Sequence, residues 1–239
     1  MSDKARGVHA ARLTSAMTLI LAPGLSFCDA PGGRIFLDLV QDRYFCLGPA
    51  ADAAFSAMVG SGKPDDEQRA RLAALEQAGI LVDDPFGACP RPCRQPPLLA
   101  SPLDEDDLVR PSAARVLGTV WAIRRAKLSL RWTSLATVCG RITALKERHA
   151  QDLRRGRPDE LARIAAAVAA SGRVVDTLDQ CLPCSIAVMR QCLAANIAAQ
   201  LSIGVKLHPF GAHAWVAADG IVLTDRLELV RPFTPLLII

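Results

Sequence analysis

The chain has 239 residues, of which 51% are hydrophobic, and its formal net charge at pH 7 is +4. A chain of this size can bury one large core or two modest ones, and we favour two. The basic residues are scattered along the sequence rather than gathered into one face, so the charge fits solubility or an acidic peptide partner better than nucleic acid. No stretch approaches the roughly 18 uncharged apolar residues of a membrane span.

The first twelve residues are polar and lack the apolar centre of a signal peptide, so we expect a cytoplasmic protein. Eight cysteines in such a chain read as reduced thiols rather than as a disulfide framework. No Gly-rich phosphate loop is visible, and we expect no cofactor or metal.

Two β-rich runs, separated by Gln41 and Asp42, predict a tight hairpin early in the chain. Two stretches with helical spacing follow; Asp65 is suited to cap the second of them and Gly79 to end it. Strands followed by short helices within about 80 residues indicate a small winged-helix-like module. The runs and helices are residues 34–40, 43–48, 49–60 and 65–81.

Residues 84–111 hold seven of the sixteen prolines and an acidic cluster at residues 104–107. Regular elements tolerate such a composition poorly, so we predict a linker here. The expected organisation is a recognition module over residues 1–85, a linker over 86–111 and a second domain over 112–239.

Three helices are predicted after the linker, over residues 112–132, 158–171 and from about residue 181. The last begins in QCLPCSIAVMRQCL, whose apolar residues recur every three or four positions. Pro183 suits the first turn, so this helix should start close to Cys181. Unpaired N–H groups and the helix dipole stabilise a thiolate there, which makes Cys181 a candidate nucleophile. Cys192 lies deep in the helix and is expected to be inert, with Cys184 intermediate.

A hairpin is predicted around Asp219-Gly220, and its loop length decides which side chains share a face. A two-residue loop would place His213 opposite Arg226 and turn Asp225 to the other face. A three-residue loop that includes Ala218 would instead place His213 opposite Asp225. We predict the three-residue loop, because it gives the imidazole an orienting carboxylate.

These residues make a Cys–His–Asp set, in which Cys181 attacks a carbonyl, His213 shuttles the proton and Asp225 orients the imidazole. The chain order, with a helix before the strands, is that of the papain and transglutaminase-like class. The fold class expected is therefore α+β, with a winged-helix-like module followed by a papain/transglutaminase-like cysteine peptidase domain.

A longer stretch resembles one particular family. CLPCSIAVMRQCLAANIAAQLSIGVKLHPFGAHAWVAADGIVLTD, residues 181–225, is similar to the core of the B proteins of lasso-peptide biosynthesis. LAPGLSFCDAPGGRIFLDLVQDRYFCLG, residues 21–48, resembles that family's PqqD-like precursor-recognition domain. Many members have Arg where this chain has Cys184, a departure that creates a Cys-x-x-Cys.

The resemblance implies a leader peptidase that binds the leader of a ribosomally made precursor and cuts it from the core. A partner cyclase of the asparagine-synthetase-like type then closes the macrolactam, and any nucleotide dependence would come through that partner. The resemblance assigns Cys181 as nucleophile, His213 as base and Asp225 as orienter. No nucleic acid or membrane partner is implied.

Peptide binding by the first module is expected to occur by strand addition along residues 43–47, with the helix over residues 65–78 as the second wall. The candidate contacts are Tyr44, Phe45, Leu47, Arg69 and Leu72.

Four other interpretations stay open. Cys181 and Cys184 with Cys89 and Cys93 could form a four-thiolate zinc site, which would leave His213 without a role. Cys181 and Cys184 could be a redox pair, although no thioredoxin-like context surrounds them. The protein could be a catalytically silent leader-binding scaffold, or an acyl transferase that uses the same three residues.

Overall fold

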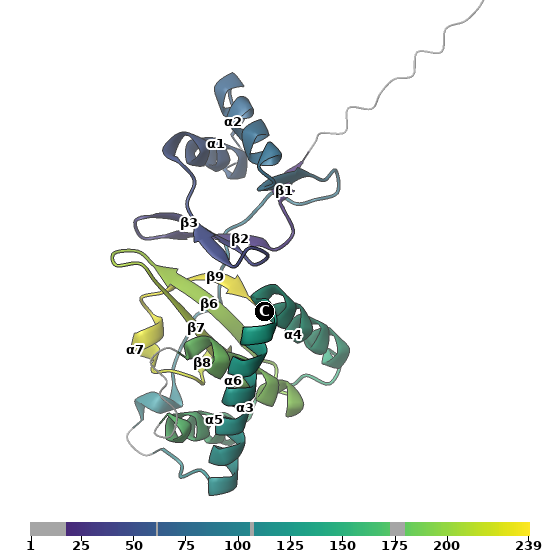
Figure 1. The fold of residues 1–239 in the computed structure, drawn as a ribbon. Coiled ribbons are helices and arrows are strands. Elements are labelled where there is room, and N and C mark those ends of the chain that lie inside the picture. Colours follow the sequence, from purple (N-terminus) through teal and green to yellow (C-terminus); the bar gives the residue numbers. More distant parts are fainter. Residues whose placement is uncertain (1–17, 61, 106–107, 173–179) are drawn as a thin grey trace, which may run out of the picture. The chain divides into compact units, whose positions relative to one another are not determined.

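The computed structural model describes residues 18–60, 62–105, 108–172 and 180–239 (Figure 1). The contacts divide the chain into two compact units. The first comprises the residues up to Pro23 together with Pro49–Pro90, and the second comprises Gly24–Gly48 together with Arg91–Ile239. We describe each unit by itself.

The first unit pairs two short strands and packs two helices beside them. Its elements are β1 (Leu19–Leu21), α1 (Pro49–Val59), α2 (Asp66–Gln77) and β5 (Leu81–Asp83), with β1 antiparallel to β5. The predicted cap is confirmed, because the Asp65 carboxylate accepts a hydrogen bond from the Gln68 amide and the Gln68 side chain bonds back to Asp65. Gly79, at φ +71°, follows the end of α2 as predicted.

The second unit begins with a three-stranded antiparallel meander. Its strands are β2 (Leu25–Ala30), β3 (Gly33–Asp38) and β4 (Arg43–Phe45), in the order β2-β3-β4. The predicted hairpin is present, but Asp38 is the last paired residue and lies opposite Arg43, so the loop is the four residues 39–42 rather than the predicted tight turn at Gln41 and Asp42.

This meander packs against β9 (Thr234–Ile238) of the same unit. Cys28, Ile35 and Leu37 share a buried cluster with Val205 and Leu236 from the other end of the chain. The expected module over residues 1–85 contained both the meander and the helices α1 and α2. In the structure the meander belongs to the second unit, whereas α1 and α2 belong to the first. The physical reason is that the apolar face of the meander is buried by the C-terminal strands, a long-range contact that sequence pattern alone does not reveal.

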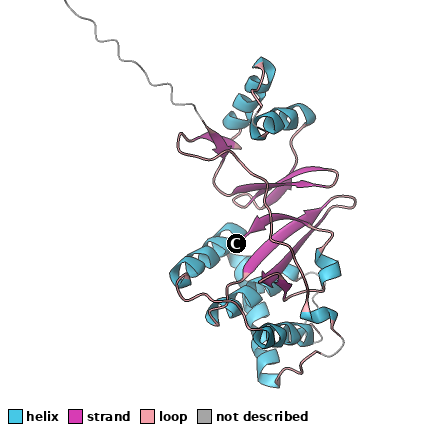
Figure 2. Cartoon of the chain, turned by 180° about the vertical axis from the view of Figure 1, so that it is seen from behind, coloured by secondary structure: helices cyan, strands magenta, loops and turns pink. Residues whose placement is uncertain are grey.

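The centre of the second unit is a four-stranded antiparallel sheet in the order β8-β7-β6-β9 (Figures 1 and 2). α6 packs against β7 and β6, and α3 and α4 pack against α6. Small elements complete the unit, namely η1 and α7. The bounds are η1 (Pro102–Asp104), α3 (Ala113–Trp132), α4 (Leu135–His149), α5 (Pro158–Ser171), α6 (Cys181–Ala194), β6 (Gln200–Lys206), β7 (Gly211–Ala218), β8 (Ile221–Val222) and α7 (Leu227–Val230).

The middle of the segment predicted as a linker is packed onto the sheet. The amide of Leu99 donates to the carbonyl of Gly220 at 2.8 Å, and Ala100 bridges to Ile221 in parallel. Proline keeps this segment extended while the sheet edge supplies its hydrogen-bond partners. Residues 97–101 are therefore an edge of the second unit rather than a free connector.

Gly204 of β6 allows the sheet to accommodate the buried indole of Trp215. A Cβ at this position would lie 2.5 Å from Cη2 of Trp215 and 3.0 Å from the backbone oxygen of Thr234. We expect Gly204→Ala to lower the free energy of unfolding by about 1–3 kcal/mol, because a fully buried ring has no room to move. Urea denaturation measures the effect.

The matched control is Gly140→Ala in α4, where an added Cβ meets no atom within 4 Å. It should stabilise the helix by about 0.5–1 kcal/mol, because glycine is the poorer helix former. A Gly204→Ala protein as stable as the Gly140→Ala protein would contradict the close contact.

Candidate active site

Cys181 is the first residue of α6, as its sequence predicted. The apolar stripe of α6 is buried, with Ile186, Met189 and Leu193 at most 4% exposed, which fixes the helix against the sheet. The Ser185 hydroxyl donates to the carbonyl of Ala214 at 2.9 Å and ties the first turn of α6 to β7. This arrangement holds the Cys181 thiol beside the strand that carries His213.

His213 lies in β7 directly across the ladder from Gly204 of β6. Its ring centroid lies 6.3 Å from that of Trp215 and 5.2 Å from that of Phe233. Trp215 therefore lies on the same strand face as His213, as a buried core residue that packs beside the imidazole. With its side chain 19% exposed, the imidazole is held by aromatic neighbours but is still reached by solvent.

The loop after β7 differs from the prediction. Ala217 pairs with Val222 and Ala218 with Ile221, so the loop is the two residues Asp219 and Gly220, and the predicted three-residue loop is wrong. Both loop residues have positive φ, +52° and +80°, as in a type I′ turn. Aspartate tolerates this conformation better than most residues with a Cβ, and the two-residue turn matches the strand twist.

Asp225 nevertheless reaches His213, with Oδ2 lying 3.2 Å from Nε2. The contact is an ion-pair distance rather than a well-aligned hydrogen bond. β8 ends at Val222, and the chain then bends over residues 223–225, where the Thr224 hydroxyl accepts from the Val216 amide. A continued ladder would have set Arg226 opposite His213; because the ladder stops, Asp225 is brought to the imidazole instead.

Residues before α3 hold Asp225 in place, and sequence reasoning missed them. The Ser101 hydroxyl donates to the carbonyl of Asp225 at 2.7 Å, and the Asp104 carboxylate accepts from the Leu227 amide at 3.4 Å. Ser101 is 3% exposed. No local signal marks this serine, because its partner is 124 residues away along the chain.

The electrostatics of the site favour a thiolate beside an imidazolium. Burial by itself would raise the pKa of Cys181, but interactions with His213 and the backbone at Ala214 and Leu182 outweigh it and lower the pKa below 9.0. Burial would likewise lower the pKa of His213, yet Asp225 and Cys181 together raise it to about 9. The thiol of Cys181 is therefore more acidic than an ordinary cysteine thiol, which is the property that a nucleophilic cysteine needs.

A hollow of about 210 Å³ opens at these residues. Its walls include Gln180, Cys184 and Thr224 besides the three candidate catalytic residues. Cys184 is 7% exposed, and burial, with the nearby charges of Asp225 and Cys181, raises its pKa to about 12. Cys184 is therefore a wall of the hollow and is protonated at neutral pH.

The predicted peptide contacts fall in both units. Tyr44 and Phe45 lie in β4, the edge strand of the meander, and Leu47 follows it. They lie beside a hollow of about 480 Å³ that Tyr44 and Phe45 line together with Phe210. The rings of Tyr44 and Phe210 are 5.6 Å apart.

The two remaining contacts are residues of α2 in the first unit. Leu72 is 4% exposed and belongs to the core of that unit, so its side chain is not available to a peptide. Arg69 is exposed and forms an ion pair with Asp66.

No three Cys, His, Asp or Glu side chains come together as metal ligands anywhere in the part of the chain that the structure describes. Among the same residues, no helix has both the length and the apolar character needed to cross a bilayer.

Residues 128–238 match the family model of the transglutaminase-like superfamily, a range that includes Cys181, His213 and Asp225. Protein inturned of Xenopus laevis is 30% identical over 78 residues, which are 30% of this chain and 8% of that protein. The chain thus spans a small fraction of that relative's length. No solved structure matches the chain.

Proposed function

Residues 128–238 form a transglutaminase-like domain, and from this premise we propose that the chain is a cysteine peptidase with Cys181 as nucleophile, His213 as acid and base, and Asp225 as orienter. The observation that carries the proposal is the meeting of these three side chains at the start of α6, with the thiol pKa lowered and the imidazole pKa raised. Transglutaminase-like domains include cysteine peptidases.

The reaction proceeds in two steps. The Cys181 thiolate attacks the scissile carbonyl, and the His213 imidazolium then gives its proton to the leaving amine as the C–N bond breaks. In the second step neutral His213 takes a proton from water, whose oxygen attacks the thioester and releases Cys181. Asp225 stabilises the imidazolium and fixes which ring nitrogen faces the thiol.

For the substrate, we propose the leader of a ribosomally made lasso-peptide precursor, cut at the junction with the core before a partner cyclase of the asparagine-synthetase-like type forms the macrolactam. The resemblance of residues 181–225 to the B proteins of that biosynthesis supports this substrate. β4 offers an edge for strand addition by the leader, beside the aromatic hollow at Tyr44 and Phe210. A PqqD-like recognition role for the N-terminal residues, Leu47 and Arg69 included, is part of the same proposal.

Incubation of the chain with a candidate leader-core peptide and the partner cyclase, followed by mass spectrometry, tests this function. We expect two products of hydrolysis, the free leader and the core. Before any ring closure, their summed mass equals that of the precursor plus one water. If the acyl group is instead transferred to an added primary amine without hydrolysis, the protein is an acyl transferase and not a peptidase. Both reactions pass through the same thioester, which either water or an amine can attack. Peptide binding without turnover would leave only a leader-binding scaffold.

A further inference from the structure

The fold gathers positive charge on the helices α3 and α4. Residues 113–149 contain eight Lys and Arg against the single acid Glu147, a net charge of +7 in a chain whose total is +4. The expectation that the basic residues are scattered is therefore wrong for this segment. The positive charge is already concentrated in this stretch of the sequence, and α3 and α4 both pack against α6.

A groove of about 560 Å³ runs between α3, α4 and the C-terminal half of α6. Four arginines line it, and none forms an ion pair with a carboxylate among the described residues; they are Arg125, Arg141, Arg148 and Arg190. Burial lowers the pKa of Arg190 below its usual value, and the charges of Arg125 and Arg141 lower it further. Within the part of the chain that the structure describes, the groove thus holds four positive charges with no carboxylate partner.

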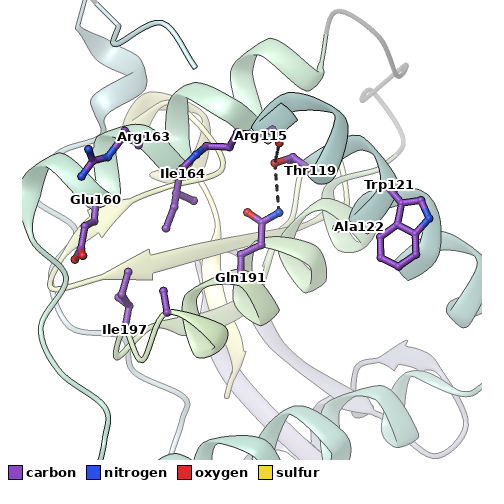
Figure 3. Close-up of a pocket in the computed structure, with 11 residues that line it drawn as sticks. Arg115, Thr119, Trp121, Ala122, Glu160, Arg163, Ile164, Gln191 and Ile197 are labelled. Atoms are coloured by element: carbon purple, nitrogen blue, oxygen red, sulfur yellow. Dashed lines mark hydrogen bonds between the residues drawn. The ribbon is translucent and has the colours of Figure 1, made fainter. Parts of the chain in front are cut away.

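A neighbouring hollow of about 550 Å³ shows the contrast (Figure 3). It shares Trp121 and Gln191 with the arginine groove, and Gln191 donates to the hydroxyl of Thr119 there. Two of its three charged residues are paired within the chain: Arg163 pairs with Asp159, and Glu160 pairs with Arg154 and Arg157. The arginine groove differs from this hollow in that four arginines line it and no acidic residue does.

An apolar stripe borders the same groove on α3. Leu117, Trp121, Leu128 and Trp132 are 66%, 62%, 55% and 82% exposed and follow one another at spacings of four, seven and four, so they lie on one face of the helix. Arg125 lies within this face, with its guanidinium 5.3 Å from the ring centroid of Trp121. Two of the three tryptophans of the chain are thus exposed on a stripe about 22 Å long.

We propose that the arginine groove and the apolar stripe of α3 together dock an acidic amphipathic helix of a partner protein. Exposed Trp and Arg are the side chains that contribute most to protein interfaces, and the four unpaired arginines require acidic residues opposite them. A small polyanion would leave the apolar stripe exposed to water. A nucleic acid would pair with the arginines but would not bury the leucines of the stripe. The length of the stripe suits a partner helix of about four turns.

The docking surface is separate from the candidate active site. Cys181 starts α6, whereas Arg190 lies nine residues along the same helix, about 13 Å away along its axis. A partner bound there leaves the thiol open to substrate. The inference rests on the charges and the exposed stripe and is independent of the proposed peptidase activity.

The test measures binding of an 18-residue synthetic helix, with Leu along one face and Glu on both flanks, to the full chain by fluorescence anisotropy. A scrambled peptide of identical composition and a 20-base-pair DNA duplex are the competing probes. We expect the amphipathic peptide to bind at least about tenfold more tightly than the scrambled one and to weaken as salt is raised.

Arg141→Gln and Trp121→Ala should each weaken binding of the amphipathic peptide about tenfold. Arg71→Gln is the matched control, because Arg71 is an exposed helical arginine that already pairs with Glu67; it should leave binding unchanged. Iodoacetamide labelling of Cys181 should be the same in all three variants, which shows that the fold around α6 is kept.

Two outcomes would overturn the proposal. Equal binding of the amphipathic and scrambled peptides would show that only charge is recognised. Tighter binding of the DNA duplex, sensitive to Arg141→Gln but not to Trp121→Ala, would assign the surface to nucleic acid instead.

Discussion

Replacement of Cys181 by alanine is expected to reduce cleavage of the leader-core peptide by at least about 10³-fold while leaving peptide binding unchanged. Cys181 supplies the thiolate that forms the thioester in the proposed reaction, so the loss falls on the chemical step rather than on affinity. Mass spectrometry gives the rate of cleavage, and fluorescence anisotropy of a labelled leader gives the affinity.

Cys184→Ser is the matched control from the same helical turn. Cys184 is buried with its pKa raised to about 12, so it supplies no thiolate at neutral pH, and the variant should keep most of the activity. Equal loss in both variants, together with stoichiometric zinc by elemental analysis, would favour a metal site over a nucleophile.

Replacement of His213 by glutamine is expected to lower the cleavage rate by a factor of about 10³ and to move the onset of Cys181 reactivity to higher pH. In the wild type, contacts with His213 overcome the burial that raises the pKa of Cys181. Without the imidazolium, only the backbone interactions of Cys181 oppose the increase in its pKa that burial causes. The pKa of the thiol is therefore higher, and the thiolate forms at a higher pH.

The rate of iodoacetamide labelling, measured as a function of pH, reports this shift. It is followed on the peptide that contains Cys181, because Cys46 and Cys89 are also exposed.

The pH profile of wild-type cleavage should have two limbs. The rate should rise as Cys181, whose pKa is lowered, loses its proton. The rate should fall as His213, whose pKa is raised to about 9, loses the proton that it gives to the leaving amine. Asp225→Asn should move the falling limb to lower pH, because the carboxylate is part of what raises the imidazole pKa. An unchanged falling limb in Asp225→Asn would remove Asp225 from the mechanism.

The local features of the candidate site followed from the sequence. Helical spacing and Pro183 placed the start of α6 at Cys181, and the alternation around His213 placed it on a strand with Trp215 on the same face. The cap at Asp65 was equally readable. Each of these depends on neighbours within about four residues, whose chemistry fixes the backbone whatever the rest of the chain does.

Only the tertiary structure decided how those pieces meet. Asp225 reaches His213 because the ladder stops at Val222 and the chain bends, not because of the loop length that the turn residues suggested. Ser101, the partner of the Asp225 carbonyl, has no local signature, and the arginines of the groove come from three helices that packing brings together. Such contacts join segments up to 124 residues apart, so their energy depends on the packed core and on where regular pairing ends, which local periodicity does not encode.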